Sequence, residues 1–126
     1  MAGISTDELV AIALEMAGMR KLPADSEVYV PGREIQRLLV ALDVGAAELL
    51  LARELGCDGV LAHHPAGGRA ILRFPEVLTR HVELMVEHGV DPAAAKAALQ
   101  PLVSRAVLRA HAANYDQVPA VARALG

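Results

Sequence analysis

The chain has 126 residues, of which 54% are hydrophobic and 21% charged, and no apolar run approaches the roughly 20 residues that a bilayer-spanning helix needs. The net charge of −3, the twelve scattered Lys and Arg residues and the scarcity of aromatic residues disfavour nucleic acid as a direct ligand. The acidic start of the sequence lacks the basic and then apolar pattern of a secretory signal, so we expect a cytoplasmic protein with no membrane contact.

The first elements expected are a helix and an extended segment. Ser5 and Glu8 have the spacing of a capping box. Apolar residues then follow at helical spacing up to Gly18: Leu9, Ile12, Ala13 and Met16. Residues 27–32 read Glu-Val-Tyr-Val-Pro-Gly and are interpreted as a short edge strand that ends in a turn.

A strand, a helix and a second strand follow. Ile35 to Leu42 becomes almost wholly apolar towards its end, which is typical of a strand covered on both faces. Residues 46–55 predict a helix closed by Gly56, and residues 58–62 predict another apolar strand. This order predicts a parallel βαβ unit. The expected fold class is therefore α/β, a layered sheet with a parallel βαβ unit flanked by helices and a helical C-terminal part.

The rest of the chain is expected to be helical. Gly67 and Gly68 are interpreted as a flexible loop before a helix over residues 75–88. Asp91 and Pro92 open a longer helix to about residue 112, which Pro101 is expected to kink or divide, and a short helix follows over residues 118–125. Without linkers or repeats, residues 1–126 are expected to form a single domain.

The candidate site centres on His63, His64 and Pro65, which directly follow the second strand. Open α/β folds place ligands at the carboxyl ends of their parallel strands. Adjacent side chains on a strand point to opposite faces, so two imidazoles converge only if the backbone leaves the sheet, and Pro65 favours such an exit. Two imidazoles with a carboxylate suit a divalent transition metal: zinc, iron, manganese or nickel. The alternative is a chance pair, one ring packed and the other solvated.

Four further polar residues are candidates. Asp116 is the candidate third metal ligand, because it ends a polar stretch between helices. Asp43, just past the end of the first strand, is expected near His63 as a hydrogen-bond partner that supports a ligand. Asp25 is assigned a supporting or substrate-facing role. His111 is a ligand, a base, or simply a residue that the dipole favours at a helix C-terminus.

Several stretches of the sequence share a pattern with a known family. They are Asp25-Ser26, Val30-Pro31-Gly32, Leu42-Asp43-Val44, residues 47–52, Gly56-Cys57-Asp58 and Ala62-His63-His64-Pro65. Together they resemble the Nif-three-like proteins, also described as GTP cyclohydrolase type 2 homologues. The His-His-Pro tripeptide after an apolar strand is the most specific mark, and the resemblance weakens between Gly68 and Asp116.

The resemblance implies a dinuclear metal centre in which His63 and His64 act together with an aspartate. Here that aspartate is Asp116, since Asn-Tyr-Asp at residues 114–116 matches the end of the family's His-Thr-Asn-x-Asp stretch. His111 lies one residue too far back to align with the family's histidine.

Family members take a further histidine and glutamate from a second half of the protein, whereas no histidine or acid follows Asp116 here. The sequence is accordingly interpreted as the amino-terminal half of a longer family pattern. The resemblance also implies α/β layers and a homo-oligomer, a toroidal hexamer.

Two functions remain open at this point. A metal-dependent hydrolase acting on a phosphorylated or nucleotide-like small molecule is the first. The alternative is a non-catalytic metal-binding scaffold or regulatory protein-interaction module.

Overall fold

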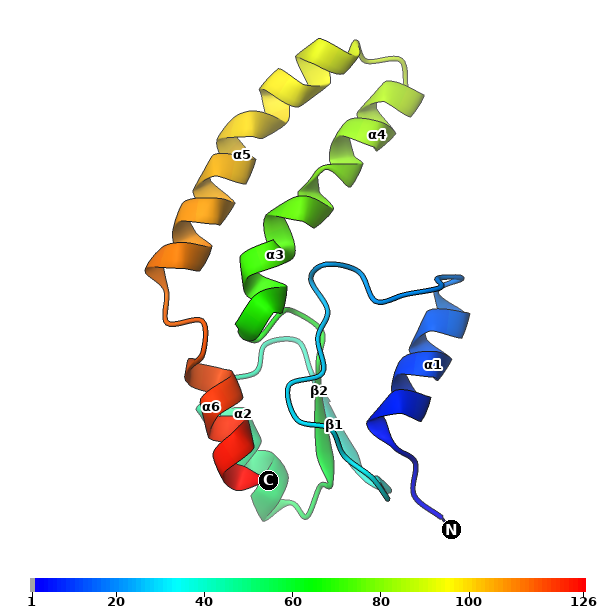
Figure 1. Cartoon of the computed structure of the whole chain (residues 1–126), viewed down its shortest axis with the longest axis vertical. Helices are drawn as coiled ribbons and strands as arrows, with labels where there is room; N and C mark the ends of the chain where they lie inside the picture. Colours follow the sequence, from blue (N-terminus) through cyan, green and yellow to red (C-terminus); the bar gives the residue numbers. More distant parts are fainter. Residues whose placement is uncertain (1) are drawn as a thin grey trace.

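Two short parallel strands and a set of helices make up the fold, which a computed structural model describes for residues 2–126 (Figure 1). In chain order the elements are α1 (Thr6–Met16), β1 (Leu38–Ala41), α2 (Ala46–Glu54), β2 (Gly59–Ala62), α3 (Gly68–Leu78), α4 (Arg80–Glu87), α5 (Pro92–Ala112) and α6 (Gln117–Leu125). The α/β class with a helical C-terminal part is confirmed. Within residues 2–126, every helix is too short or too polar to cross a bilayer.

The capping box at the start of α1 is confirmed. The Ser5 hydroxyl accepts a hydrogen bond from the amide of Glu8 at 3.2 Å, and the Glu8 carboxylate accepts one from the amide of Ser5 at 2.7 Å. These bonds satisfy two amides that the first helical turn leaves without partners. The helix ends before Gly18, whose positive φ of 64° suits glycine.

The parallel βαβ unit is also confirmed. Leu38 lies opposite Gly59 and Ala41 opposite Ala62, with α2 connecting the two strands. The first strand is shorter than expected because Ile35 instead forms an antiparallel bridge with Ile4. The expectation that this strand is covered on both faces was wrong for residues 2–126, since the sheet has only two strands there and Val40 is 63% exposed.

Asp58 ties the beginnings of the two strands together. Its carboxylate accepts hydrogen bonds from the amides of Gln36 and Arg37, both at 2.9 Å, and its own amide donates to the Arg37 carbonyl at 2.8 Å. The bonds from the Gln36 and Arg37 amides favour the charged carboxylate and hold the pKa of Asp58 below its ordinary value of 3.8.

Replacing Asp58 with asparagine is expected to make stability less dependent on acid. Because folding lowers the pKa, the carboxylate's contribution is complete above its ordinary value of 3.8 and is lost as the pH falls through the folded value. Urea unfolding between about pH 6 and pH 2 should therefore show a steeper loss of stability for the parent chain than for Asp58→Asn. Parallel curves for the two proteins would contradict this role.

The helices α3, α4 and α5 form a helical arm that projects away from the sheet (Figure 1). Both α3 and α4 pack along α5, and small and branched residues are buried between them: Ala70, Leu78, Ala95, Leu99 and Ala110. Of the two effects expected of Pro101, a kink or a division of the last long helix, the division does not occur, because α5 is continuous through it. The packing of two helices along α5 outweighs the one backbone bond that a proline removes.

Two expectations about neighbouring segments were wrong. Residues 27–32 form no strand, and α3 begins at Gly68 instead of near Pro75. The two errors are linked, because Glu27 accepts a hydrogen bond from the amide of Ala70 in the first turn of α3. A helix start stabilised from a distant segment leaves no local capping pattern to recognise.

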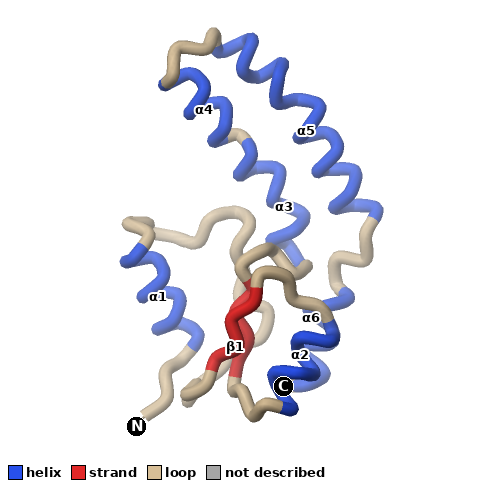
Figure 2. The backbone as a smooth tube through the Cα atoms, turned by 180° about the vertical axis from the view of Figure 1, so that it is seen from behind, coloured by secondary structure: helices blue, strands red, loops and turns tan. Residues whose placement is uncertain are grey.

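Helices flank the two strands but leave Val40 and Leu61 exposed. Seen from behind, α2 and α6 lie to one side of the strands and α1 to the other (Figure 2). The packing of α2 against both β2 and α6 connects the end of the chain to the βαβ unit. The segment after the carboxyl end of β2, residues 63–67, leads from the sheet to α3 at the base of the helical arm.

Candidate metal site

The two histidines follow β2 at a point where the backbone leaves the regular ladder. The amide of His63 donates to the Ala41 carbonyl at 2.8 Å, and the next amide, of His64, donates to the Leu42 carbonyl at 2.9 Å. In a regular ladder alternate amides face one neighbour, so two consecutive bonds mark a turn of the backbone. The two rings lie side by side, with centroids 4.9 Å apart and planes inclined by 45°.

Asp43 lies against the second of these rings. Its Oδ1 is 2.9 Å from Nδ1 of His64, the neighbour of the ring of His63, beside which Asp43 was expected. When the carboxylate accepts the proton of Nδ1, Nε2 is left with the free lone pair that a metal ligand needs. The side chains of His64 and Asp43 are 57% and 88% exposed, so this pair contributes little to stability by itself.

The backbone beside Asp116 lies close to the histidine segment, but the carboxylate of Asp116 binds Arg123. The carbonyl of the preceding Tyr115 accepts a hydrogen bond from the amide of Gly68 at 2.6 Å. The Asp116 carboxylate is bound by Nη2 of Arg123, at 2.9 Å and 2.7 Å to its two oxygens. The structure therefore brings the residue near the histidine segment without joining its carboxylate to the imidazoles.

Of the other two candidates, Asp25 lies beside a cavity and His111 lies at an exposed helix end. Asp25 is half-buried and lines a cavity of about 430 Å³ that His63 and His64 also line. His111 is exposed on the last turn of α5 and is not part of that cavity wall. Asp25 could thus face a small molecule in the cavity, whereas the structure does not bring His111 to it.

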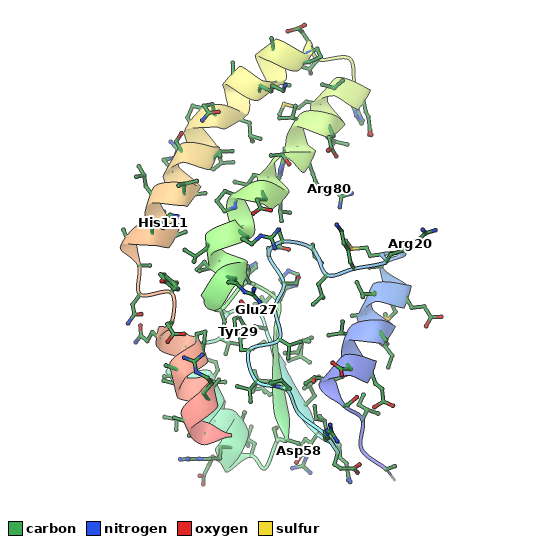
Figure 3. The ribbon with its side chains drawn as sticks, viewed as in Figure 1. Arg20, Glu27, Tyr29, Asp58, Arg80 and His111 are labelled. Atoms are coloured by element: carbon green, nitrogen blue, oxygen red, sulfur yellow. The ribbon has the colours of Figure 1, made fainter. Side chains whose placement is uncertain are left out.

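Glu27 and Tyr29, which were not among the candidates from the sequence, hold the loop after the histidines (Figure 3). The Tyr29 hydroxyl donates to the Gly67 carbonyl at 2.9 Å and accepts from the Gly67 amide at 3.2 Å. Glu27 binds the amide of Ala70 and the side chain of Arg69. Burial of Tyr29 raises its pKa, which keeps the hydroxyl proton available as a donor.

The sequence around Glu27 and Tyr29 does carry a pattern, but that pattern predicts a strand and not a contact with a distant loop. Glu27 and Tyr29 alternate with two valines, and that alternation predicts a strand. A tyrosine is amphipathic and usually finds a hydrogen-bond partner when it is buried. In a chain with two tyrosines, that property was the one indication that Tyr29 anchors another segment.

Replacing Tyr29 with phenylalanine is expected to destabilise the fold by about 1–3 kcal/mol, because the buried amide and carbonyl of Gly67 lose their partner. Tyr115→Phe is the matched control, since the ring of Tyr115 is 44% exposed. Urea unfolding of the two variants provides the comparison. Equal midpoints for Tyr29→Phe and Tyr115→Phe would show that the Gly67 contacts contribute nothing.

The residues at this site provide part of the ligand set that a divalent transition metal needs. Two adjacent imidazoles, one of them supported by a carboxylate, provide two nitrogen ligands of the kind that such ions bind. Across residues 2–126, however, no group of three or more His, Cys, Asp or Glu side chains is placed to hold a metal ion. A catalytic zinc usually has three protein ligands, so at least one more donor has to join His63 and His64.

Comparison with known proteins adds one relative of known structure. No protein-family model and no curated protein matches the sequence. The crystal structure of a NIF3 superfamily protein from Sphaerobacter thermophilus matches with 66% sequence identity and a TM-score of 0.95. The match covers 99% of this chain and 46% of the other, so this chain spans less than half the length of that protein.

Proposed function

Because this chain belongs to the NIF3 superfamily, we propose that it binds a divalent transition metal through His63 and His64 and serves as a metal-dependent hydrolase. The observation that carries the proposal is the adjacency of the two rings, 4.9 Å apart, with Asp43 against one of them. A solvated histidine would need no such support, whereas metal-binding histidines almost always have it.

The metal proposed is zinc, iron, manganese or nickel, as one ion or two. A bound ion of this kind would lower the pKa of a water molecule, to about 7 in the case of zinc, and would polarise a phosphoryl oxygen. In this proposal His63 and His64 are ligands, Asp43 orients the ring of His64, and Asp116 becomes a ligand once its carboxylate leaves Arg123. Arg123 lies within 2.9 Å of that carboxylate and would then be free to bind an anionic group.

The substrate class proposed is a phosphorylated or nucleotide-like small molecule. The cavity of about 430 Å³ beside the histidines falls within the usual size range of small-molecule sites, about 300–1,000 Å³. Asp25 and Tyr29 line this cavity together with the histidines, so polar groups from separate segments face it.

Metal content after reconstitution is the first test. The purified chain, stripped with a chelator and dialysed against zinc, manganese, iron or nickel, is expected to retain about one equivalent or more by elemental analysis. Less than about half an equivalent with every metal would contradict a preformed site.

A second candidate function is favoured by a different observation. Large apolar side chains are exposed on both strands, including Val40 at 63% and Leu61 at 46%, which is typical of a surface that binds protein. This would make the chain a metal-binding scaffold or regulatory module. Metal-dependent hydrolysis of GTP or of a phosphoester, lost in His63→Ala, favours the enzyme; partner binding that survives the same substitution, with no turnover, favours the scaffold.

A further inference from the structure

Arg123 binds the carboxylate of Asp116 in a way that uses little of its guanidinium group. Both oxygens of Asp116 contact the same nitrogen, Nη2, at 2.9 Å and 2.7 Å. A guanidinium carries five N–H groups in a fixed fork, and among residues 2–126 neither Nε nor Nη1 of Arg123 has a hydrogen-bond partner. Arg123 can therefore exchange Asp116 for another anion without breaking any further contact.

A second exposed pair, Arg73 with Glu76 on α3, shows the stronger geometry. There Nε and Nη2 each bind a separate carboxylate oxygen, at 2.9 Å and 2.8 Å. Two parallel bonds of this kind are what arginine forms with carboxylates and phosphates in tight complexes. The side chains are about equally exposed, at 52% and 55% in the Arg123 pair and 56% and 55% in the Arg73 pair, so the pairs differ in geometry and not in burial. Asp116 is therefore the more easily released carboxylate.

A phosphate group competes with Asp116 for one nitrogen. Each edge of a guanidinium that can bind two oxygens, Nε with Nη2 or Nη1 with Nη2, includes Nη2. A phosphate held by two parallel bonds therefore needs the nitrogen that Asp116 occupies in this structure. Because the contact of Arg123 with Asp116 is exposed, it contributes little to stability, and a dianionic phosphate can displace it.

The displaced carboxylate belongs to a segment that lies next to the histidines. Gly68 ends the loop after the two histidines, and its amide donates to the carbonyl of Tyr115, the residue before Asp116, at 2.6 Å. Arg123 is the only charged side chain among residues 117–126, so its release leaves Asp116 without a cation from that stretch. A divalent ion at the histidines then attracts the carboxylate, and Arg123 keeps a positive charge that favours an anion.

We propose that Arg123 binds the phosphate group of the substrate and that Asp116 moves from Arg123 to the metal when it does so. Phosphate and metal then raise each other's affinity, because both favour the state in which the pair of Arg123 and Asp116 is broken. The inference rests on the proposed metal site at His63 and His64. It adds to that site a residue that recognises phosphate and a coupling between the two ligands.

The test measures the zinc affinity of the chain with and without millimolar inorganic phosphate. A chelator buffer fixes the concentration of free zinc, so that complexes of zinc with phosphate in solution do not affect the result. Phosphate is expected to raise the zinc affinity of the parent chain by about fivefold, and zinc should tighten phosphate binding, followed by phosphorus NMR, by the same factor. Methylphosphonate stands for an organic phosphate: a larger rise than with inorganic phosphate assigns the site to esters, and an equal or smaller one to the phosphate group alone. Either result supports the proposal.

Two arginine variants provide the comparison. Arg123→Gln frees Asp116 permanently, so it is expected to raise the zinc affinity measured without phosphate by about two- to fivefold, the range that an exposed ion pair allows. Phosphate should then change that affinity by less than about twofold, because the arginine that binds it is gone. Arg73→Gln breaks the matched pair on α3 and should behave as the parent chain. Urea unfolding verifies that both variants keep the fold.

A double substitution separates release of Asp116 from a simple effect of charge. Loss of a positive charge by itself also favours a cation nearby. In the Asp116→Asn background, however, Arg123→Gln should leave zinc affinity unchanged, because no carboxylate remains to be released. An effect of the same size in both backgrounds would show that Arg123 acts through its charge alone, and the proposal would be wrong.

Two further results would overturn the proposal. One is an equal rise with phosphate in the parent chain and in Arg123→Gln, which would assign the phosphate to the metal alone. The other is no rise in either protein. Failure of the metal site gives a different result, since the chain would then take up less than about half an equivalent of zinc with or without phosphate. A chain that binds zinc without any coupling contradicts this inference and leaves the proposed function standing.

Discussion

His64→Ala is expected to lower the affinity of the chain for a divalent transition metal by more than about 100-fold, because it removes a ligand and not merely a group that supports one. The same substitution leaves the fold intact, since the ring is 57% exposed and its one hydrogen bond, to Asp43, lies at the surface. Competition with a chromophoric chelator measures the affinity. Urea unfolding of the metal-free protein verifies the fold.

Asp43→Asn provides a graded comparison. The amide occupies the same space as the carboxylate but is a weaker acceptor for the Nδ1 proton of His64. Loss of such a supporting partner typically costs 10–100-fold in metal affinity, less than loss of the ligand itself. The order expected is therefore the parent chain, then Asp43→Asn, then His64→Ala.

His88→Ala is the matched control for this series. His88 is also exposed, and its Nδ1 is 3.0 Å from the carbonyl of Leu84 within the helical arm. Its loss should not change metal affinity. If His88→Ala weakened binding as much as His64→Ala, the metal would be bound by exposed imidazoles in general. The paired histidines would then have no special role.

The approach of the two rings could be foreseen from sequence because it follows from a local rule. A proline after the second histidine favours departure from the ladder, and the consecutive amide bonds of His63 and His64 show that departure. The direction of the Asp116 side chain could not be foreseen. It depends on Arg123, seven residues further on, and no local pattern indicates which partner a carboxylate selects.

The elements that were predicted correctly are each identified by residues close together in the sequence. The capping box of α1, the Asp91 cap of α5 and the βαβ order each involve residues within a few positions of one another. The start of α3 was missed because its stabilising groups, Glu27 and Tyr29, are about forty residues away in the chain. The uncovered sheet was missed for a related reason. An apolar run of residues favours a buried strand but does not say whether neighbouring elements cover it.

Gly67→Ala is expected to destabilise the fold by about 3 kcal/mol, at the upper end of the usual range for an overpacked site. A Cβ on Gly67 would lie 2.5 Å from the Tyr115 carbonyl oxygen and 2.7 Å from Cδ of Pro119. Neither neighbour yields easily, since one is backbone and the other is a fully buried ring at the start of α6. Gly68 adds to the constraint, because its amide binds the same Tyr115 carbonyl at 2.6 Å.

Gly45→Ala is the control for this substitution, because a Cβ there meets only the flexible carboxylate of Glu48, at 3.2 Å. Its loss of stability should be well below that of Gly67→Ala in urea unfolding. Since Gly67 joins the histidine segment to α6, Gly67→Ala should also weaken metal binding, whereas Gly45→Ala should not. Equal midpoints for the two variants would mean that α6 is not packed against Gly67. The contact that holds Asp116 near the histidines would then be absent, and with it the reason to expect that carboxylate among the ligands.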